Sequence, residues 1–446
     1  MTDWKKYFAG RRVLVMGLGL LGRQINVVKF LVRQGAEVTV TDLKNKNELR
    51  PALEELEGLE GVNYVLGKHR LKDFRSADMV IRGANVPLGS PYLAEARSKG
   101  VPVKMDSSLF LELAPEGVIS VGVTGTRGKS TVTHMIAGGL EEAGRKVFLG
   151  GNIRGVATLP LLERVSSGDY VVLELDSWQL QGFGESRISP RVAVFTTFMR
   201  DHMNYYGNDT EQYLEDKANI FRFQTADDHL ILGRQCAERV REKYPFIASQ
   251  ITVIGRGELP SSWRLKIPGK HNRYNAALAT TALDICGVKR KMIKKSLENF
   301  AGVPGRLEYL GKVQKVRFYN DNNATTPDAV LAALSALEKY KGKIILIGGG
   351  ADKELDFNEY GREVPQYLKK LILLEGEASV KMEKVLPQEM RPETVDSVKE
   401  AVERAWQSAE PGDVVLFSPG ASSFNMFRNE YERNDRFLEL FHQLSN

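Results

Sequence analysis

A glycine-rich stretch between residues 122 and 131 carries the residue types that bind nucleotide phosphates. Its sequence, Gly-Val-Thr-Gly-Thr-Arg-Gly-Lys-Ser-Thr, follows a β-branched apolar run and leads into a helical pattern. Backbone N–H groups in such a loop can surround phosphate oxygens, and the helix N-terminus attracts the same negative charge. The ammonium of Lys129 would reach the β- and γ-phosphates, while Ser130 or Thr131 would offer a hydroxyl to Mg²⁺. The residues predicted to bind ATP here are Gly125, Thr126, Arg127, Gly128, Lys129, Ser130 and Thr131.

A second glycine-rich turn, Gly-Leu-Gly-Leu-Leu-Gly at residues 17–22, also lies between an apolar run and a helical pattern. The next apolar run ends at Asp42, about 20 residues beyond the last glycine, which is the spacing of the dinucleotide-binding fingerprint. In that fingerprint the glycines let a pyrophosphate approach the backbone, and the acid binds a ribose hydroxyl. Taken alone, the turn predicts an NAD-dependent oxidoreductase. The alternative is a Rossmann-like domain whose crevice binds another nucleotide, or none.

Composition narrows the class of protein. The chain has 446 residues, of which 42% are hydrophobic and 26% charged, so we expect a globular protein of about three domains and not a disordered one. No apolar run is long enough to cross a membrane, and the first residues lack the apolar segment of a secretory signal. Two cysteines without a Cys-x-x-Cys pair argue against a disulfide framework or a thiolate zinc site and favour the cytoplasm.

Charge gives no indication of a nucleic-acid or membrane partner. Lys and Arg number 62 against 56 Asp and Glu, and the resulting net charge of +6 is small for this length. The densest basic cluster, at residues 289–295, has no interleaved aromatic side chains and is typical of a solvated helix face. We therefore expect small anionic substrates such as nucleotides, and we expect the chain to act as a monomer.

The elements that must position these motifs alternate short strands with helices. Apolar β-branched runs recur between glycine-rich turns and helical patterns, which is typical of parallel sheets covered on both faces. The predicted strands are residues 12–16, 37–41, 79–81, 118–123, 170–175, 192–197, 230–232, 344–347, 371–374 and 414–417. Proline and glycine interrupt the pattern near residues 114–115 and 303–305. We predict an α/β protein with domains at residues 1–114, 115–303 and 304–446.

Taken in order along the chain, the motifs resemble those of the Mur ligases, the ADP-forming amino-acid ligases of peptidoglycan synthesis. Besides the stretch 122–131, the resemblance rests on Gly-Asn-Ile at 151–153, Leu-Glu-Leu-Asp-Ser-Trp-Gln-Leu at 173–180, Asp-His-Met at 201–203, His-Asn-Arg-Tyr-Asn-Ala at 271–276, Val-Pro-Gly-Arg-Leu-Glu at 303–308 and Asn-Asp at 320–321. It covers nearly the whole chain. It implies a Rossmann-like N-terminal domain that binds a uridine nucleotide, a central P-loop ATPase-type domain with a parallel sheet, and a C-terminal Rossmann-like α/β domain that binds an amino acid.

The reaction that this resemblance implies joins a carboxylate to an amine with the consumption of ATP. The carboxylate is phosphorylated first, and the amine then displaces phosphate through a tetrahedral intermediate. Such a site needs cations and oriented donors more than a covalent nucleophile. By resemblance, the catalytic residues are Lys129, Glu174, His202 and Lys217. The implied ligands of two Mg²⁺ ions are Ser130, Glu174, His202 and, once carbamylated, Lys217. Further implied ATP contacts are Asn272 and Asn275 on the adenine side, and Arg306 and Asp321 in the third domain.

Three segments resemble the branch of the family that adds D-glutamate to UDP-N-acetylmuramoyl-L-alanine. They are the turn at 17–22, the loop Gly-Gly-Gly-Ala-Asp-Lys-Glu-Leu-Asp-Phe at 348–357, and the run Ser-Pro-Gly-Ala-Ser-Ser-Phe that begins at 418. Lys353 would pair with one carboxylate of D-glutamate, and Ser423 would hold the other. The substrate contacts implied by the resemblance are Leu20, Leu21, Asp42, Asn85, Asn152, Thr325, Lys353, Ser423, Phe424 and Tyr431.

Three departures from the family pattern fall at expected substrate contacts. Where the family has a lysine in Asn-Asp-Ser-Lys-Ala-Thr, this chain has Asn323, so the positive charge must come from elsewhere or be dispensable. The family's Asn-Phe-Glu-x-Arg-Gly becomes Asn-Glu-Tyr-Glu-Arg-Asn at 429–434, so the aromatic ring is either displaced or supplied by Tyr431. Residues 82–87 replace a Ser-Pro-Gly turn. Three alternatives stay open: another ADP-forming ligase of the Mur or folylpolyglutamate type, an NAD-dependent oxidoreductase, and a nucleotide-binding protein without catalysis.

Overall fold

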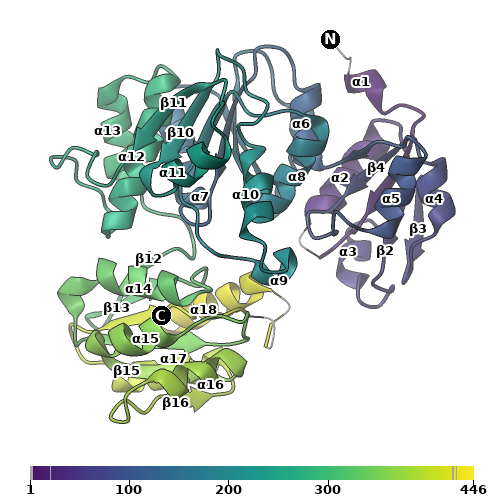
Figure 1. Ribbon diagram of the computed structural model, residues 1–446. Helices are drawn as coiled ribbons and strands as arrows, with labels where there is room; N and C mark the ends of the chain where they lie inside the picture. The colour runs from purple at the N-terminus through teal and green to yellow at the C-terminus, as the bar shows by residue number, and fades with distance from the viewer. Residues whose placement is uncertain (1–3, 21, 424–425, 428, 446) are drawn as a thin grey trace. The chain divides into compact units, whose positions relative to one another are not determined.

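The computed structural model describes residues 4–20, 22–423, 426–427 and 429–445, and it is an α/β protein with three sheets (Figure 1). The chain divides into two compact units. The first comprises Met1–Leu259 and Asn275–Leu297 and contains two of the sheets, and the second comprises Pro260–Tyr274 and Glu298–Asn446 and contains the third. In the described part of the chain, no helix has the length and apolar character needed to span a membrane.

The first sheet has five parallel strands in the order β3-β2-β1-β4-β5. Its strands are β1 (Arg12–Met16), β2 (Glu37–Asp42), β3 (Val62–Leu66), β4 (Met79–Arg82) and β5 (Val103–Lys104), and the helices of this region are α1 (Trp4–Tyr7), α2 (Arg23–Arg33), α3 (Arg50–Glu54), α4 (Leu71–Ser76), α5 (Pro91–Ser98) and α6 (Asp106–Leu113). Val13 and Val15 pack in the core that includes α2, whereas Leu14 and Met16 pack with α4 and α5. Burial on both faces explains why β1 is a continuous apolar run.

The second sheet has six parallel strands in the order β11-β10-β9-β6-β8-β7. Its strands are β6 (Ile119–Thr124), β7 (Val147–Gly151), β8 (Tyr170–Glu174), β9 (Val192–Phe195), β10 (His229–Gly233) and β11 (Gln250–Ile254). The helices of this region are α7 (Lys129–Glu142), η1 (Leu159–Glu163), α8 (Ser177–Ser186), α9 (Met203–Tyr206), α10 (Thr210–Ala218), α11 (Arg234–Lys243), α12 (Lys270–Ile285) and α13 (Arg290–Asn299). Because β6 lies between β8 and β9, the loops that follow these three strands meet at one edge of the sheet.

The third sheet is mixed, with six strands in the order β12-β13-β17-β14-β15-β16. Its strands are β12 (Glu308–Val313), β13 (Val316–Asn320), β14 (Ile344–Gly349), β15 (Leu368–Leu374), β16 (Glu393–Val395) and β17 (Val414–Phe417). The remaining helices are α14 (Pro327–Ala336), η2 (Glu338–Tyr340), α15 (Asn358–Glu363), η3 (Val364–Gln366), α16 (Glu377–Val385), α17 (Val398–Ser408) and α18 (Glu430–Ser445). Ile344 and Leu346 of β14 pack against α14, α15 and α16, whereas Ile345 and Ile347 pack against α17 and α18.

β12, which is not among the predicted strands, runs antiparallel to β13 and makes the third sheet mixed. Only Gln314 and Lys315 connect the two strands, and both have positive φ, at 46° and 71°. Two consecutive residues of this conformation form the tight turn that reverses the chain in a β-hairpin. The fold class is otherwise confirmed, because helices cover both faces of strands in three α/β sheets (Figure 1). The predicted domain bounds stay predictions.

Candidate active site

The glycine-rich loop that follows β6 has a backbone that side chains would disrupt. Gly125 and Gly128 have φ of 138° and 90°, which L side chains rarely adopt. A Cβ at Gly125 would overlap Thr196 Oγ1, and a Cβ at Gly128 would lie 2.6 Å from Asn275 Oδ1. The N–H of Thr126 donates to the carbonyl of Thr197 at 2.7 Å, which ties the loop to the end of β9. The loop is therefore shaped by its neighbours and not by its own composition alone.

The side chain of Lys129 lies back over this loop. Its Nζ donates to the carbonyl oxygens of Gly125 at 2.9 Å and Thr126 at 3.2 Å. The helix α7 begins at Lys129, so the positive end of the helix and the ammonium are together. This arrangement can attract and hold phosphate groups.

Ser130 and Glu174 meet directly, although the sequence separates them by 44 residues. The Ser130 hydroxyl donates to Glu174 Oε1 at 2.8 Å, and both residues are buried. Val123 of β6 is in register with Glu174 of β8, so adjacent parallel strands bring the two side chains to the same edge. The helix that follows, α8, begins at a capping box in which Asp176 accepts from the N–H of Gln179 at 2.7 Å.

The Ser130–Glu174 pair fits a magnesium ion. Mg²⁺ prefers oxygen ligands and is usually held by one or two carboxylates, with waters and phosphate oxygens completing the set. Among the described residues there is no cluster of three or more His, Cys, Asp or Glu side chains that could hold a metal by itself. One buried carboxylate beside a hydroxyl on a phosphate-binding loop instead suits an ion that arrives with the nucleotide.

His202 lies close to the same edge, after β9. It has a left-handed backbone conformation, with φ of 57°, and it precedes α9. The ring centroid lies 4.7 Å from that of Trp178, and Nε2 lies 3.8 Å from Asp201 Oδ2. Asp201 in turn accepts from Arg127 Nη1 at 2.9 Å. The imidazole is therefore linked to the glycine-rich loop through one carboxylate.

Lys217 of α10 is buried, with 1% of its surface exposed, and its Nζ points at the end of β6. It donates to the carbonyl of Gly125 at 3.1 Å and lies 4.8 Å from the ring centroid of Tyr213. Burial, and secondarily the charge of Lys129, hold the pKa of the Lys217 amine well below its usual range. A neutral buried amine is nucleophilic, which is the property that reaction with CO₂ requires.

Asn152 lies beside Glu174, at the end of the neighbouring strand β7. Its N–H donates to the carbonyl of Glu174 at 2.6 Å, and its Oδ1 accepts from Arg23 Nη2 at 3.0 Å. Arg23 is the first residue of α2, directly after the glycine turn, and sequence reasoning did not select it. Its position at the start of the helix that follows the glycine-rich turn could have indicated a role in nucleotide binding.

The turn at residues 17–22 has the geometry expected of a nucleotide-binding crevice. Gly17, Gly19 and Gly22 all have positive φ. Asp42, at the end of β2, accepts from the N–H of Gly19 at 3.3 Å and from that of Lys44 at 2.9 Å. The exposed Asn85 comes near the same turn, since its Oδ1 would lie 3.9 Å from a Cβ on Gly17. Leu20 is half-buried, and Leu21 is outside the described residues.

In the second compact unit, Asp321 is buried at the end of β13, and both of its carboxylate oxygens accept hydrogen bonds. Its Oδ1 accepts from the N–H of Leu307 at 2.9 Å, and its Oδ2 accepts from Ser418 Oγ at 2.8 Å. Burial raises the pKa of Asp321 to about 7, against the lowering effect of these bonds and of Arg306. Arg306 Nε is buried and makes no hydrogen bond within the described residues.

The two asparagines of the predicted adenine side are both buried. Asn272 donates from Nδ2 to the carbonyl of Pro268 at 2.6 Å. Asn275 lies against Gly128, as described above.

The residues expected to bind D-glutamate follow neighbouring strands of the third sheet. Thr325, Lys353 and Ser423 come after β13, β14 and β17, whose carboxyl ends are adjacent because β17 lies between the other two. Ala351 and Ser422 exchange backbone hydrogen bonds of 3.0 and 3.1 Å, which join two of these loops. Ser423 is buried, Thr325, Lys353 and Tyr431 are half-buried, and Phe424 lies outside the described residues.

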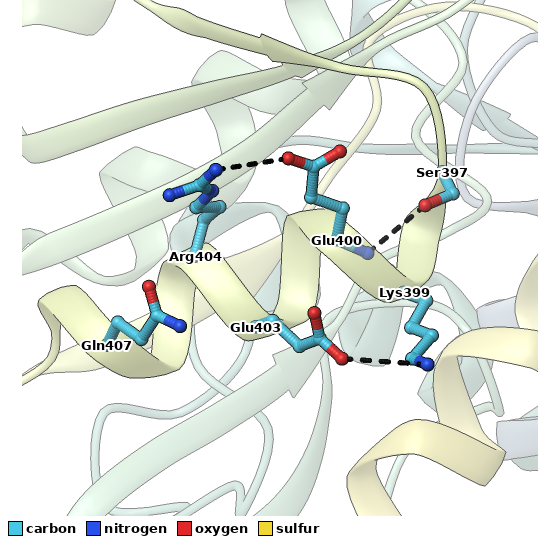
Figure 2. Close-up of a pocket in the computed structure, with 6 residues that line it drawn as sticks. All are labelled: Ser397, Lys399, Glu400, Glu403, Arg404 and Gln407. Atoms are coloured by element: carbon cyan, nitrogen blue, oxygen red, sulfur yellow. Dashed lines mark hydrogen bonds and ion pairs between the residues drawn. The ribbon is translucent and has the colours of Figure 1, made fainter.

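A surface hollow on α17 does not involve any predicted site residue. Figure 2 shows its lining, which is Ser397, Lys399, Glu400, Glu403, Arg404 and Gln407. These side chains pair with one another: Arg404 contacts Glu400 at 3.3 Å, Lys399 contacts Glu403 at 3.9 Å, and Ser397 caps the helix. The hollow is thus a solvated helix face.

Comparison with known proteins assigns the family. Models described as "Mur ligase MurD-like, N-terminal domain", "Mur ligase middle domain" and "Mur ligase, glutamate ligase domain" match residues 11–104, 123–263 and 305–420. The chain belongs to the Mur ligase family. The first of these models spans the turn at 17–22, so that turn belongs to a Mur ligase domain and not to a dehydrogenase.

Relatives that match across the whole chain narrow the assignment. A UDP-N-acetylmuramoylalanine--D-glutamate ligase of Roseiflexus sp. (strain RS-1) is 36% identical, covering 97% of this chain and 98% of its own. One from Acetivibrio thermocellus is 33% identical, covering 100% and 99%. Among solved structures, MurF ligase of Thermotoga maritima in complex with ADP has a TM-score of 0.63 at 16% identity, covering 100% and 99%. MurC of the same organism has a TM-score of 0.62 at 20% identity, covering 97% and 99%, and both structures share the fold.

Proposed function

We propose that this protein joins D-glutamate to UDP-N-acetylmuramoyl-L-alanine in the synthesis of peptidoglycan precursors, with conversion of ATP to ADP and phosphate. The observation that carries the proposal is the match over the full chain to relatives named for that reaction, at 36% and 33% identity. We place the reaction in the cytoplasm and assign it to a monomer. Two cysteines that form no disulfide, Cys236 and Cys286, agree with a reducing compartment.

The reaction has two chemical steps. A carboxylate oxygen of the alanyl group attacks the γ-phosphorus of ATP, the bond to the bridging oxygen breaks, and ADP leaves. The amine of D-glutamate then attacks the acyl carbon, gives up a proton, and expels phosphate from the tetrahedral intermediate. Negative charge is present on phosphoryl oxygens throughout, so oriented N–H groups and cations supply most of the catalysis.

The chain's own groups are assigned to these tasks as follows. The backbone N–H groups of residues 128–131 and the ammonium of Lys129 bind the phosphates, since this ammonium is held over the loop at 2.9 Å from the Gly125 carbonyl, whereas the N–H groups of Thr126 and Arg127 donate to Thr197. Ser130 and Glu174 would hold a first Mg²⁺, which would neutralise phosphate charge. His202 and a carbamylated Lys217 would be ligands of a second. The proposed ATP contacts outside the loop are Asn272, Asn275, Arg306 and Asp321.

Carbamylation of Lys217 turns an amine into an anion. The neutral amine attacks the carbon of CO₂, loses a proton, and becomes an N-carboxylate with two oxygen ligands. Two features favour this step: Nζ lies 3.5 Å from Thr124 Oγ1 in a buried position, and burial lowers the pKa of the amine, which favours its unprotonated form. Among the described residues its hydrogen-bond partners are this hydroxyl and the carbonyl of Gly125, both neutral, so the change of charge breaks no hydrogen-bonded ion pair.

Substrate binding is assigned to two groups of residues. The UDP-sugar contacts are Leu20, Leu21, Asp42, Asn85 and Asn152. The D-glutamate contacts are Thr325, Lys353, Ser423, Phe424 and Tyr431.

Release of phosphate from ATP, measured with UDP-N-acetylmuramoyl-L-alanine present, tests the proposal. We expect release that requires D-glutamate and is absent with L-glutamate, L-lysine or meso-diaminopimelate. Release with one of the others would keep the ligase and overturn the amino-acid specificity. An absence of release with all four would overturn the proposed reaction.

A further inference from the structure

Arg433 is one of the most deeply buried side chains of the protein. It lies in the first turn of α18, and 1% of its surface is exposed. An arginine is almost never buried to this degree unless it is paired. The contacts of its guanidinium must therefore account for the burial of this cation.

The hydrogen bonds of this guanidinium all end on neutral groups. Nε donates to Asn322 Oδ1 at 2.8 Å, Nη2 donates to the carbonyl of Asn322 at 3.0 Å, and Nη1 donates to the carbonyl of Ala421 at 3.2 Å. Within the described residues no carboxylate accepts a hydrogen bond from Arg433, and Glu430 is the acidic side chain whose charge acts on it. Burial lowers the pKa of Arg433 to about 10, so the group is still cationic at neutral pH.

The partners of Arg433 belong to two loops that follow adjacent strands. Asn322 is in the loop after β13, Ala421 is in the loop after β17, and these strands are hydrogen bonded in parallel. The amide of Asn322 also donates to the carbonyl of Glu430 at 2.9 Å, which joins the first loop to the start of α18. Arg433 therefore joins the two loops, together with the hydrogen bond from Ser418 to Asp321 and that from the Gly420 N–H to the Ala324 carbonyl at 2.8 Å.

The same two loops contain residues that we assign to D-glutamate, Thr325 in the first and Ser423 in the second. The first loop, Asn-Asp-Asn-Asn-Ala-Thr-Thr at 320–326, has no cationic side chain, because Asn323 stands where a lysine was expected. Asn323 instead donates its N–H to the carbonyl of Gly305 at 3.0 Å. A ligand with two carboxylates would therefore bind beside a loop that has no cationic side chain. The guanidinium of Arg433 is a cation that contacts this loop, since it donates hydrogen bonds to Asn322.

We propose that Arg433 is a positioning residue for the amino-acid site, which holds the β13 and β17 loops together and supplies the positive charge behind them that an anionic amino acid requires. The inference rests on the proposed use of D-glutamate. It is unfavourable to bury a cation that has no hydrogen-bonded anionic partner, and apolar side chains of similar volume would stabilise the fold at least as well. A bound carboxylate offsets that cost, so the charge stabilises the complex more than the free protein.

Three variants test the inference: Arg433→Gln, Arg433→Lys, and Arg433→Gln combined with Asn323→Lys. Steady-state ADP release gives KM for D-glutamate, ATP and the UDP-linked substrate, and the melting temperature reports stability. We expect Arg433→Gln to raise KM for D-glutamate by about tenfold or more while KM for ATP changes less than about twofold. Arg433→Lys retains the charge and should show a smaller increase. Adding Asn323→Lys to Arg433→Gln should recover part of the affinity, because it returns a cation to the loop.

Arg12→Gln is the control, because Arg12 lies at the start of β1 in the first compact unit, where it is paired with Asp78 at 2.7 Å. It should lower the melting temperature without a selective change in KM for D-glutamate. An equal rise of all three KM values in Arg433→Gln, or no recovery by Asn323→Lys, would overturn the inference. If Arg433→Gln does not fold, a folded Arg433→Lys should still show a selective increase in KM for D-glutamate of less than about tenfold, and a KM for D-glutamate equal to that of the unmodified protein would contradict the inference. Failure of the unmodified protein to use D-glutamate would instead refute the proposed function.

Discussion

The hydroxyl of Ser130 donates a hydrogen bond to Glu174 Oε1 at 2.8 Å, and this contact joins the start of α7 to the end of β8. Both residues are almost fully buried, with 6% and 4% of their surface exposed. The pair places a negative charge beside a loop that is otherwise built to attract phosphate. A divalent cation placed between the Glu174 carboxylate and the phosphates would neutralise both negative charges and stabilise a bound nucleotide.

Replacement of Glu174 by glutamine should abolish most of the turnover without unfolding the protein. The amide oxygen can still accept from Ser130, but it has no charge to hold Mg²⁺. We expect kcat to fall about 100-fold or more and the melting temperature to change little. ADP release as a function of Mg²⁺ concentration measures the effect. Glu163→Gln, which removes a carboxylate paired with Arg33 at 2.9 Å, is the control and should retain its turnover.

Alanine at Gly128 should weaken ATP binding, because the new Cβ would lie 2.6 Å from Asn275 Oδ1 and the backbone has φ of 90°. Gly144→Ala is a matched control, since Gly144 has φ of 70° but a Cβ added there would have no heavy atom within 4 Å. Both variants should lose about 1 kcal/mol or more of stability from backbone strain. Only Gly128→Ala should lower ATP affinity, by about tenfold or more. Isothermal titration with ATP would contradict this if both variants bound equally well.

Lys217 should be carbamylated in the active protein. Removal of dissolved CO₂ should lower activity, and added bicarbonate should restore it. Lys217→Arg, which cannot form the carbamate, should lose about 100-fold in kcat. Carbon NMR with labelled bicarbonate provides a direct measurement, because the carbamate signal must appear in the native protein and be absent from Lys217→Arg. Lys243→Arg, at a surface lysine paired with Glu215 at 3.0 Å, should keep both the signal and the activity.

Asp321 should make stability depend on pH near neutrality. Its pKa is raised from 3.8 to about 7 on folding, so between these values the native state binds more protons than the unfolded state. Stability should therefore decline as pH rises from about 4 to about 7, by roughly 1–4 kcal/mol, and then become independent of this group. Thermal melting across this range, compared with Asp321→Asn, provides the measurement. Parallel curves for the two proteins would show that another group is responsible.

Local spacing is sufficient to predict much of this protein. The loop at 122–131 and the turn at 17–22 are recognised from consecutive residues, and all ten predicted strands are present with bounds shifted by a few residues. These strands are apolar along their length because both faces are covered. The strands at the edges of the sheets, β3, β5, β7, β11, β12 and β16, were not among those predicted, since an edge strand needs no continuous apolar run. The interior strand β13 was also not predicted. It forms a hairpin with β12, and the turn residues Gln314 and Lys315 are not those that usually mark such a turn.

Contacts between distant segments follow from the order of strands in a sheet, which consecutive residues do not specify. Ser130 reaches Glu174 because β6 pairs with β8, and Lys217 reaches Gly125 because α10 packs on the same sheet. In the sequence, Arg433 is indistinguishable from a charged residue on an exposed helix. In the structure, its guanidinium donates to Asn322 in the β13 loop and to Ala421 in the β17 loop. Short motifs of consecutive residues thus indicate which kind of chemistry the protein performs. Burial, charge balance and the pairing of side chains depend instead on packing between elements that lie tens of residues apart in the chain.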